Sequence, residues 1–461
     1  MRILCLPYGR HRERMRRTME KTKRKQQFIV YREVGEDSLL AKMEQVMLYY
    51  DVDRREDDYL YWKTGSAQGD YCACIHELID LAGSHGFYGN LWHDYLTYLL
   101  VNNENAFSKA CEIRGAVDGS INELVKYDFT LFRELYSYDF SALEDALGLS
   151  FYQVISSYRN VNEDSKIFNR RIRDRICELS RKLGEAKDVQ EFMEDMIAFY
   201  KDFGVGKLGL HKAFRIVHRE EGAEIVPITN ITHVHLDDLV GYEIAKKKLI
   251  ENTEAFVQGR KANNCLLFGD AGTGKSSSIK GILNQYYDQG LRMIEVYKHQ
   301  FKDLNDVISQ IKNRNYRFII YMDDLSFEEF EIEYKYLKAV IEGGLEKKPE
   351  NILIYATSNR RHLIKEEFAD KEGRRDALHS SDTVQEKLSL VSRFGVQIFF
   401  CAPDKKEYQN IVKVLAARYG VSMPEEELLL EANKWELSHG GLSGRSAQQF
   451  IDYLIGSYLE K

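Results

Sequence analysis

Residues 265–276 read CLLFGDAGTGKS, an apolar run of four followed by a glycine-bracketed loop that ends in Lys275-Ser276. The apolar run predicts a buried strand, and the loop predicts a turn that cradles phosphate just before a helix begins. Gly269, Gly272 and Gly274 let the backbone approach a polyphosphate, because no Cβ blocks the turn. The stretch therefore predicts a strand–loop–helix unit that binds a nucleoside triphosphate.

The loop supplies groups for each part of such a ligand. Backbone N–H groups and the N-terminus of the following helix would face the phosphates. Lys275 is placed for the β- and γ-phosphates and the Ser276 hydroxyl for Mg²⁺. An ordinary glycine turn before a helix is the alternative, and the strand in front of the loop counts against it. The residues expected to contact the nucleotide are Gly269, Asp270, Ala271, Gly272, Thr273, Gly274, Lys275, Ser276 and Ser277.

Composition bounds the class of protein. The chain has 461 residues, enough for two or three domains, and its 44% hydrophobic and 30% charged content is that of a soluble globular protein. A net charge of −7 does not favour a general nucleic-acid coat. Seven cysteines without regular spacing suit a reducing compartment, and no apolar run approaches the length of a membrane span. We expect a cytoplasmic protein with no membrane association.

The N-terminal half has three segments of different character. Residues 1–27 carry ten Lys and Arg, which predicts a basic N-terminal tail, solvated or able to bind nucleic acid. Over 28–215 apolar residues recur three or four apart, as in Leu39-Leu40-Met43-Val46-Met47, which predicts a mainly helical domain. Residues 216–235 are polar and β-branched, and we expect a linker there.

The C-terminal half alternates between strand and helix patterns. Over 236–402 this alternation predicts an α/β core, a parallel sheet covered by helices on both faces. Residues 403–461 predict a small unit of amphipathic helices. The expected strands are 265–268, 293–297, 317–322, 352–356 and 396–401, and the expected C-terminal helices are about 405–418, 424–437 and 446–459.

Acidic and amide side chains follow two of the expected strands. The strand at 318–322 ends in Asp323-Asp324, where one carboxylate can hold Mg²⁺ and its neighbour can polarise an attacking water. The strand at 352–355 leads to Asn359, whose amide can orient water without changing the charge. Ligands lie at the carboxyl ends of parallel strands, so we expect these groups beside the phosphate loop.

Two arginines complete the candidate catalytic set. Arg393, in Ser392-Arg393-Phe394-Gly395, comes just before the fifth strand and can neutralise charge on a transferring phosphoryl group. Arg445 opens the final helix and could reach back to the nucleotide. Arg360-Arg361 and Arg374-Arg375 are a solvated charged face, or alternatively line a pore or bind nucleic acid.

The order of these elements resembles an AAA+ ATPase. GDAGTGKS resembles Walker A, FIIYMDD Walker B, ATSN sensor 1, SRFG an arginine finger and SGRSAQQF sensor 2, while LDDLVGYE at 236–243 resembles the segment that contacts adenine. More narrowly, DDLSFEE, YLKAVIEGGLEKKPENILIYATSNRRHL and EKLSLVSRFG resemble an uncharacterised bacterial ATP-binding AAA+ family, one of the domain-of-unknown-function families. The match is dense over 230–461, and the N-terminal half corresponds loosely to that family's helical extension.

The resemblance implies an AAA+ ATPase core at 236–402, a helical lid at 403–461, and ATP and Mg²⁺ as ligands. It implies catalytic roles for Asp323, Asp324, Asn359, Arg393 and Arg445, and Mg²⁺ ligation by Ser276 and Asp323. It also implies a homo-oligomer, possibly a hexamer, because in AAA+ rings the arginine finger acts on the neighbouring subunit's nucleotide.

One departure leaves the rate of hydrolysis open. Most AAA+ proteins have Glu where this chain has Asp324, and the shorter side chain could place the base poorly. Glu328 and Glu329 are acidic alternatives beyond the strand end. The first hypothesis is ATP hydrolysis coupled to remodelling of an unknown protein client. Alternatives are a helicase-loader or initiator-like ATPase acting with nucleic acid, which is possible but not favoured, and a nucleotide switch with little hydrolysis.

Overall fold

The computed structural model describes residues 27–51, 66–160, 170–220, 222–229, 231, 234–327, 333–342, 349–359 and 390–458. It divides the chain into two compact units, Met1–His211 and Lys212–Lys461. Apart from Gln27, the expected basic tail lies outside the described residues. So do Glu328, Glu329, Arg360, Arg361, Arg374 and Arg375.

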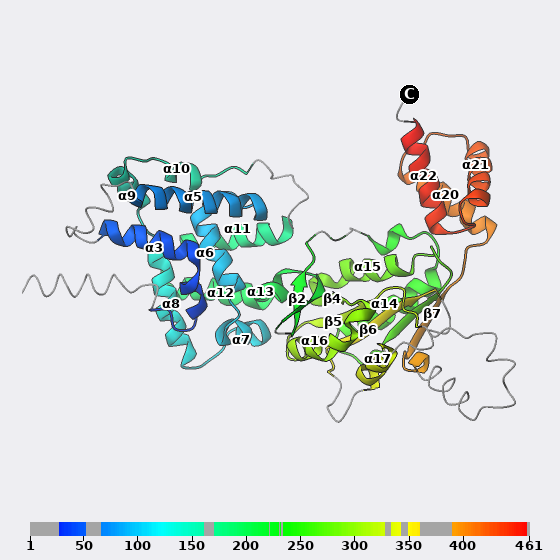
Figure 1. The fold of residues 1–461 in the computed structure, drawn as a ribbon, viewed down its shortest axis with the longest axis horizontal. Coiled ribbons are helices and arrows are strands. Elements are labelled where there is room, and N and C mark those ends of the chain that lie inside the picture. The colour runs from blue at the N-terminus through cyan, green and yellow to red at the C-terminus, as the bar shows by residue number, and fades with distance from the viewer. Residues whose placement is uncertain are drawn as a thin grey trace, which may run out of the picture. The chain divides into compact units, whose positions relative to one another are not determined.

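The named elements in the described part of the N-terminal unit are all helices, which confirms the predicted fold class for this half (Figure 1). Its helices pack around buried aromatic side chains, among them Tyr31, Trp92, Phe129 and Tyr200. The elements are η1 (Arg32–Glu36), α3 (Ser38–Asp51), α5 (Ser66–His85), α6 (Leu91–Asn102), α7 (Ala106–Arg114), α8 (Ile121–Tyr136), α9 (Phe140–Leu147), α10 (Tyr152–Ile155), α11 (Arg170–Glu185), α12 (Val189–Phe203) and α13 (Gly206–Leu210).

A buried carboxylate ties the start of this unit to its centre. Asp128 on α8 accepts hydrogen bonds from the backbone N–H groups of Ile29, Val30 and Tyr31, at 2.8–3.2 Å. The hydroxyl groups of Tyr31 and Tyr200 lie 3.0 Å apart, and Tyr200 donates to the Leu100 carbonyl at 2.8 Å. Because a buried polar group without a partner is costly, these contacts fix one arrangement of α6, α8 and α12.

The C-terminal unit is built on a seven-stranded sheet of order β2-β1-β4-β5-β6-β3-β7. All neighbouring pairs are parallel except β1–β2. The α/β prediction is therefore confirmed, and the five expected strands are present with ends shifted by up to two residues. The strands are β1 (Ala213–Arg219), β2 (Gly222–Pro227), β3 (Cys265–Gly269), β4 (Leu291–Glu295), β5 (Arg317–Met322), β6 (Ile352–Ser358) and β7 (Val396–Phe400).

The expected linker at 216–235 is wrong over its first part. Strands β1 and β2 form an antiparallel hairpin with Ile216 opposite Ile225, and β1 adds to the sheet in parallel beside β4. Phe214, Ile216 and Ile225 are buried, whereas Arg215, His218 and Arg219 are exposed. The hairpin lies at the sheet edge and buries only part of its surface, so its sequence is polar enough to resemble a linker.

Helices cover both faces of the sheet (Figure 1). α14 (Glu243–Val257) and α15 (Lys275–Tyr286) pack on the face that carries Leu267, Tyr321 and Tyr355. α16 (Leu304–Ile311) and α17 (Glu333–Glu342) lie on the other side. Three short 3-10 turns lie in the connections between strands and helices: η2 (Leu236–Asp238), η3 (Tyr287–Gln289) and η4 (Lys298–Asp303). Parallel pairing brings the carboxyl ends of β3, β5 and β6 to one edge.

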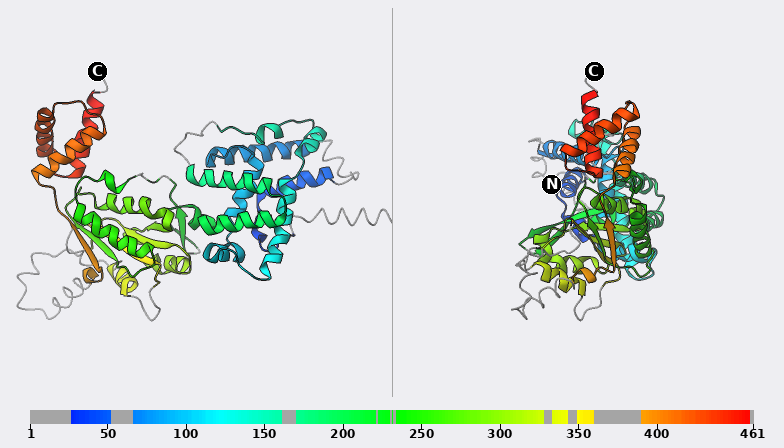
Figure 2. Two further views of the ribbon diagram at one scale, coloured as in Figure 1. Left: turned by 180° about the vertical axis from the view of Figure 1, so that it is seen from behind. Right: turned by 90° about the vertical axis from the view of Figure 1, so that its right-hand side faces the viewer.

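Three further helices form a small bundle after β7 (Figure 2). They are α20 (Lys405–Arg418), α21 (Glu425–Ser438) and α22 (Gly444–Tyr458), close to the predicted ranges. Tyr408, Val412, Ala432, Ala447 and Ile451 are fully buried in the bundle core. Within the described ranges, every helix is too short or too polar to span a bilayer.

Candidate nucleotide-binding site

The first turn of the phosphate loop is shaped by its contact with β7. Gly269 has φ 133°, and a Cβ there would lie 2.0 Å from the carbonyl oxygen of Phe400. The N–H of Asp270 donates to the same carbonyl at 3.0 Å, and Asp270 Oδ2 accepts from the N–H of Ala402 at 2.7 Å. Only glycine fits this close approach, and the Asp270 carboxylate ties the loop to the chain that leaves β7.

The second half of the loop contacts the C-terminal bundle. Gly272 and Gly274 have φ of 73° and 91°, in the left-handed region that favours glycine. A Cβ on Gly272 would lie 3.0 Å from Ser443 Oγ and 3.1 Å from Arg445 Cβ. The N–H of Arg445 donates to the Gly272 carbonyl at 3.2 Å. The start of α22 therefore lies directly against the loop.

Lys275 is the first residue of α15 and is only 6% exposed. Its Nζ donates to the carbonyl oxygens of Gly269 and Asp270 at 3.0 and 2.6 Å. Burial lowers the pKa of Lys275, and nearby Asp270, Asp324 and Asp323 oppose that shift. The first N–H groups of a helix have no partner within the helix, so the start of α15 combines a helix N-terminus with a side-chain cation.

The candidate magnesium ligands are in direct contact. The Ser276 hydroxyl donates to Asp323 Oδ1 at 2.7 Å, and the Thr357 hydroxyl donates to the same oxygen at 2.6 Å. Burial raises the pKa of Asp323, but the hydrogen bonds from Thr357 and Ser276 outweigh it, so the pKa lies below its usual value. A hydroxyl and an ionised carboxylate held together fit the oxygen ligands that Mg²⁺ prefers.

Asp324 has an unusual backbone conformation. Its φ is 49°, one of two positive values at non-glycine residues among the described residues. Its N–H donates to Thr357 Oγ1 at 2.9 Å, and the N–H of Leu325 donates to the Thr357 carbonyl at 2.7 Å. The Asn359 amide donates to Asp324 Oδ1 at 2.8 Å. The two acids and the amide thus form one connected group at the ends of β5 and β6.

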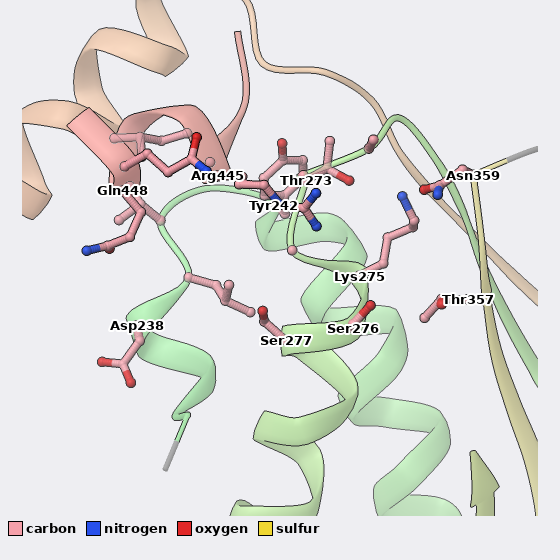
Figure 3. A pocket seen from close by; sticks show the side chains of 18 of the residues that line it. Asp238, Tyr242, Thr273, Lys275, Ser276, Ser277, Thr357, Asn359, Arg445 and Gln448 are labelled. Carbon is pink, nitrogen blue, oxygen red and sulfur yellow. The ribbon is translucent and has the colours of Figure 1, made fainter. Parts of the chain in front are cut away.

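These elements surround a cavity of about 550 Å³. Figure 3 shows Lys275 and Ser276 on one side, with Arg445 and Gln448 coming from α22. Leu239, Val240, Tyr242, Ile411 and Leu415 form an apolar part of the wall suited to a planar base. Other lining residues are Asp238, Ala271, Gly272, Thr273, Gly274, Ser277, Asp323, Asp324, Thr357, Asn359, Gly444 and Gln449.

Outside the LDDLVGYE segment, six lining residues were not singled out individually from the sequence: Thr357, Ile411, Leu415, Gly444, Gln448 and Gln449. Thr357 was detectable in principle, since it follows Ala356, which pairs with Met322 just before Asp323. Ile411 and Leu415 are four residues apart on α20 and look like ordinary core positions of an amphipathic helix. Gln448 and Gln449 belong to the stretch SGRSAQQF, but by residue type alone they resemble a solvated helix face.

The two candidate arginines lie in different places. Arg445 lines the cavity. Arg393 is exposed, closes a helical turn through its N–H to the Leu390 carbonyl at 3.2 Å, and precedes β7. β7 runs from Val396 toward the phosphate loop at Phe400, a length of about 13 Å, and Arg393 precedes the end of the strand that is farther from the loop. It is not among the described residues that line the cavity of its own chain.

The parallel sheet, the phosphate loop after β3, the acidic end of β5 and the helical unit whose last helix contacts the loop define a P-loop NTPase fold of the AAA+ type. The family model described as "Protein of unknown function (DUF815)" matches residues 209–458. The chain belongs to this family.

Solved structures with similar folds share little sequence with the chain. The Holliday junction branch migration motor RuvB of Thermotoga maritima matches with 15% identity and a TM-score of 0.30, over 48% of this chain and 71% of that one. The AAA domain of FIGL-1 in complex with ADP matches with 17% identity and a TM-score of 0.34, over 50% of this chain and 76% of the other. No curated protein matches the chain.

Proposed function

We propose that this protein binds ATP with Mg²⁺ and hydrolyses it. The observation that carries the proposal is the connected group of Ser276, Asp323, Asp324 and Asn359 beside Lys275. A binding loop alone needs no acids and no amide around it. A pair of carboxylates, one bonded to the loop serine and one bonded to an amide, can hold Mg²⁺ and orient water for attack on a phosphate.

Each part of ATP has matching groups in the cavity. The N–H groups of the loop and the Nζ of Lys275 would bind the phosphates, and the apolar wall with Tyr242 would bind the base. Magnesium, when bound with the nucleotide, would be held by Ser276 and Asp323 and would neutralise phosphate charge. Arg445 adds a second cation on the lid side.

Asp324 is the proposed general base. Asp324 lies at the end of β5, and its Oδ1 accepts a hydrogen bond of 2.8 Å from the amide of Asn359. The amide would hold the carboxylate and the attacking water in fixed orientations. Because Asp is one methylene shorter than Glu, we expect turnover at the slow end of the range for such enzymes, about 1 per second or less.

We further propose that the protein acts as a homo-oligomer, possibly a hexamer, that remodels a protein client. The position of Arg393 supports this, because an arginine that does not line its own cavity would have to reach a nucleotide bound by another chain to act in hydrolysis. Coupling to movement is supported by contacts between lid and nucleotide site. Arg445 N–H binds the loop, and Arg418 Nη1 binds the Asp238 carbonyl at 3.0 Å. Changes at the phosphates would therefore reach the lid.

The direct test is phosphate release from ATP by the purified full chain, with Lys275→Ala and Asp324→Asn as variants. Lys275→Ala should bind ATP at least about 100-fold more weakly, whereas Asp324→Asn should bind normally and turn over at least about 100-fold more slowly. Lys247→Ala changes an exposed lysine on α14 and is the matched control. Tight ATP binding without phosphate release in the unmodified chain would contradict an ATPase and favour a nucleotide switch.

The Asp324→Asn variant also serves to identify the client. Asp324→Asn in the native cell with ATP should retain a client that the Lys275→Ala variant does not. Retention of the same proteins by both variants would contradict a nucleotide-dependent client. Retention of nucleic acid, lost at high salt, would instead favour the loader-like alternative.

A further inference from the structure

We infer that Thr357 is a positioning residue for ATP hydrolysis: its single hydroxyl holds the two acids at the end of β5 in their working arrangement. The inference rests on the proposed function, because it concerns the same site. Thr357 is on β6 and is 2% exposed, and it lies in the ATSN stretch, in which only Asn359 is singled out from the sequence.

The hydroxyl of Thr357 both donates and accepts a hydrogen bond. It donates to Asp323 Oδ1 at 2.6 Å and accepts from the N–H of Asp324 at 2.9 Å. A hydroxyl has one donor hydrogen and can accept as well, so a single atom meets both demands. Parallel pairing of β5 with β6 places Thr357 next to Asp323 and makes this double contact possible.

The first contact orients the candidate magnesium ligand. Asp323 Oδ1 receives two hydrogen bonds, one from Ser276 on α15 and one from Thr357 on β6. Both favour the ionised form and limit rotation of the side chain. Without Thr357 this oxygen would keep only the hydrogen bond from Ser276, and the Asp323 side chain would be less restricted about its χ angles.

The second contact holds the candidate base through its backbone. Asp324 has φ 49°, a left-handed conformation that costs about 1 kcal/mol or more for a residue with a side chain. The N–H groups of Asp324 and Leu325 bind the hydroxyl and carbonyl oxygens of Thr357, which offsets this cost. The turned backbone directs Asp324 toward Asn359, at 2.8 Å. Here the position of the short acid is set by the backbone turn.

Three variants separate positioning from plain stability. Thr357→Val keeps the shape but removes the hydroxyl, and Thr357→Ser restores a hydroxyl without the methyl group. Thr253→Val is the matched control, since Thr253 is a fully buried threonine whose hydroxyl also makes two contacts, with the Leu249 carbonyl and the Tyr355 hydroxyl. Tyr355 is on the same strand, β6, two residues before Thr357.

The measurements are kcat and KM for ATP, the affinity for a fluorescent ATP analogue, and the Mg²⁺ concentration that half-saturates analogue binding. We expect Thr357→Val to lower kcat at least about tenfold and to raise the half-saturating Mg²⁺ concentration, while affinity without Mg²⁺ changes less than about threefold. Thr357→Ser should recover most of kcat. Thr253→Val should lower the melting temperature with kcat and Mg²⁺ dependence retained.

The inference is overturned if Thr357→Val keeps kcat and Mg²⁺ dependence, or if Thr253→Val produces the same losses. Failure of the proposed function is a different result, namely no phosphate release by the unmodified chain. In that case the half-saturating Mg²⁺ concentration for analogue binding still tests the inference. A higher concentration for Thr357→Val but not for Thr253→Val supports the positioning of Asp323 by Thr357. An unchanged concentration for Thr357→Val overturns the inference.

Discussion

The amide of Asn359 donates a hydrogen bond of 2.8 Å to Oδ1 of Asp324. The two residues belong to the ends of neighbouring strands, β6 and β5, which are separated by more than thirty residues of chain. The contact joins the proposed base to an amide that can orient water without carrying a charge. The geometry of the proposed water attack therefore depends on how β5 and β6 end together.

Replacing Asn359 by Ala should slow ATP hydrolysis about 10- to 100-fold with little change in ATP affinity. The reason is that a hydrogen bond to a charged group contributes about 1.5–3 kcal/mol, here to the orientation of Asp324. Steady-state kinetics and equilibrium binding of ATP measure the two quantities separately. Asn252→Ala is the control, since its amide binds Tyr355 and Asn263 away from the cavity. Unchanged kcat in Asn359→Ala would exclude this role.

Gly269→Ala should destabilise the C-terminal unit far more than Gly290→Ala. Both glycines have positive φ, 133° and 90°, but a Cβ at Gly269 meets the Phe400 carbonyl oxygen at 2.0 Å and one at Gly290 meets nothing within 4 Å. Backbone strain alone costs about 1–2 kcal/mol, and overpacking adds about 1–3 kcal/mol at Gly269. Thermal unfolding of the full chain measures both. Equal losses would show that the β7 contact does not restrict the loop.

The stability of the N-terminal unit should fall as pH rises from about 4 to 7, because of Asp94. Asp94 on α6 is 2% exposed, and burial raises its pKa to about 7, although contacts with Ser180 and Cys177 on α11 oppose the shift. Since the pKa is higher in the folded chain than in the unfolded chain, the folded state binds the proton more tightly. Its stabilisation is complete below the unfolded pKa and is lost by pH 7, at up to about 1.4 kcal/mol per pH unit.

Hydrogen exchange of peptides from α6 and α11 tests this effect in the intact chain. Asp94→Asn removes the titrating proton while keeping the shape, so the difference in protection between the two proteins cancels the pH dependence of exchange itself. We expect Asp94→Asn to be relatively more protected at pH 8 than at pH 5. A difference that does not change with pH would show that Asp94 has the same pKa folded and unfolded.

Much of the site was accessible from the sequence because strand ends are local features. The loop at 269–276, Asp323 and Asn359 each follow an apolar run, and parallel pairing brings such ends together whatever the loops between them do. The structure brings residues 271–277, Asp323, Asn359 and Arg445 to one cavity, which Gly269 and Asp270 do not line, and the chemical roles of all these residues remain predictions. The helical character of the N-terminal half was visible for the same reason, since helix periodicity is local.

What the sequence could not predict depends on contacts between distant segments. The place of Thr357 between Asp323 and Asp324 follows from the register of β5 against β6, which no single strand specifies. The positive φ of Asp324 accompanies the hydrogen bond from its N–H to Thr357, a residue of another strand. The hairpin of β1 and β2 was taken for a linker because its strand character depends on pairing with β4. Such features carry no local pattern.

Arg393 provides the sharpest test of whether the protein works as an oligomer. Arg393→Ala should bind ATP normally, because the residue does not line its own cavity among the described residues, yet it should hydrolyse ATP at least about 1000-fold more slowly. Lys275→Ala should also be inactive, for lack of ATP binding. Each variant keeps the group that the other lacks. If Arg393 acts on a neighbouring chain, a mixture of the two forms some complete sites.

In a random equal mixture, about one quarter of the interfaces join an intact ATP site to an intact Arg393, so about a quarter of the unmodified activity should return. Mixing Lys275→Ala with a chain that carries both changes should restore nothing, which controls for effects of assembly alone. The expected recovery is specific to action between chains, since a residue that served its own cavity could not be supplied by another subunit. Inactive mixtures from subunits that demonstrably co-assemble, or normal hydrolysis by Arg393→Ala alone, would rule out the shared site.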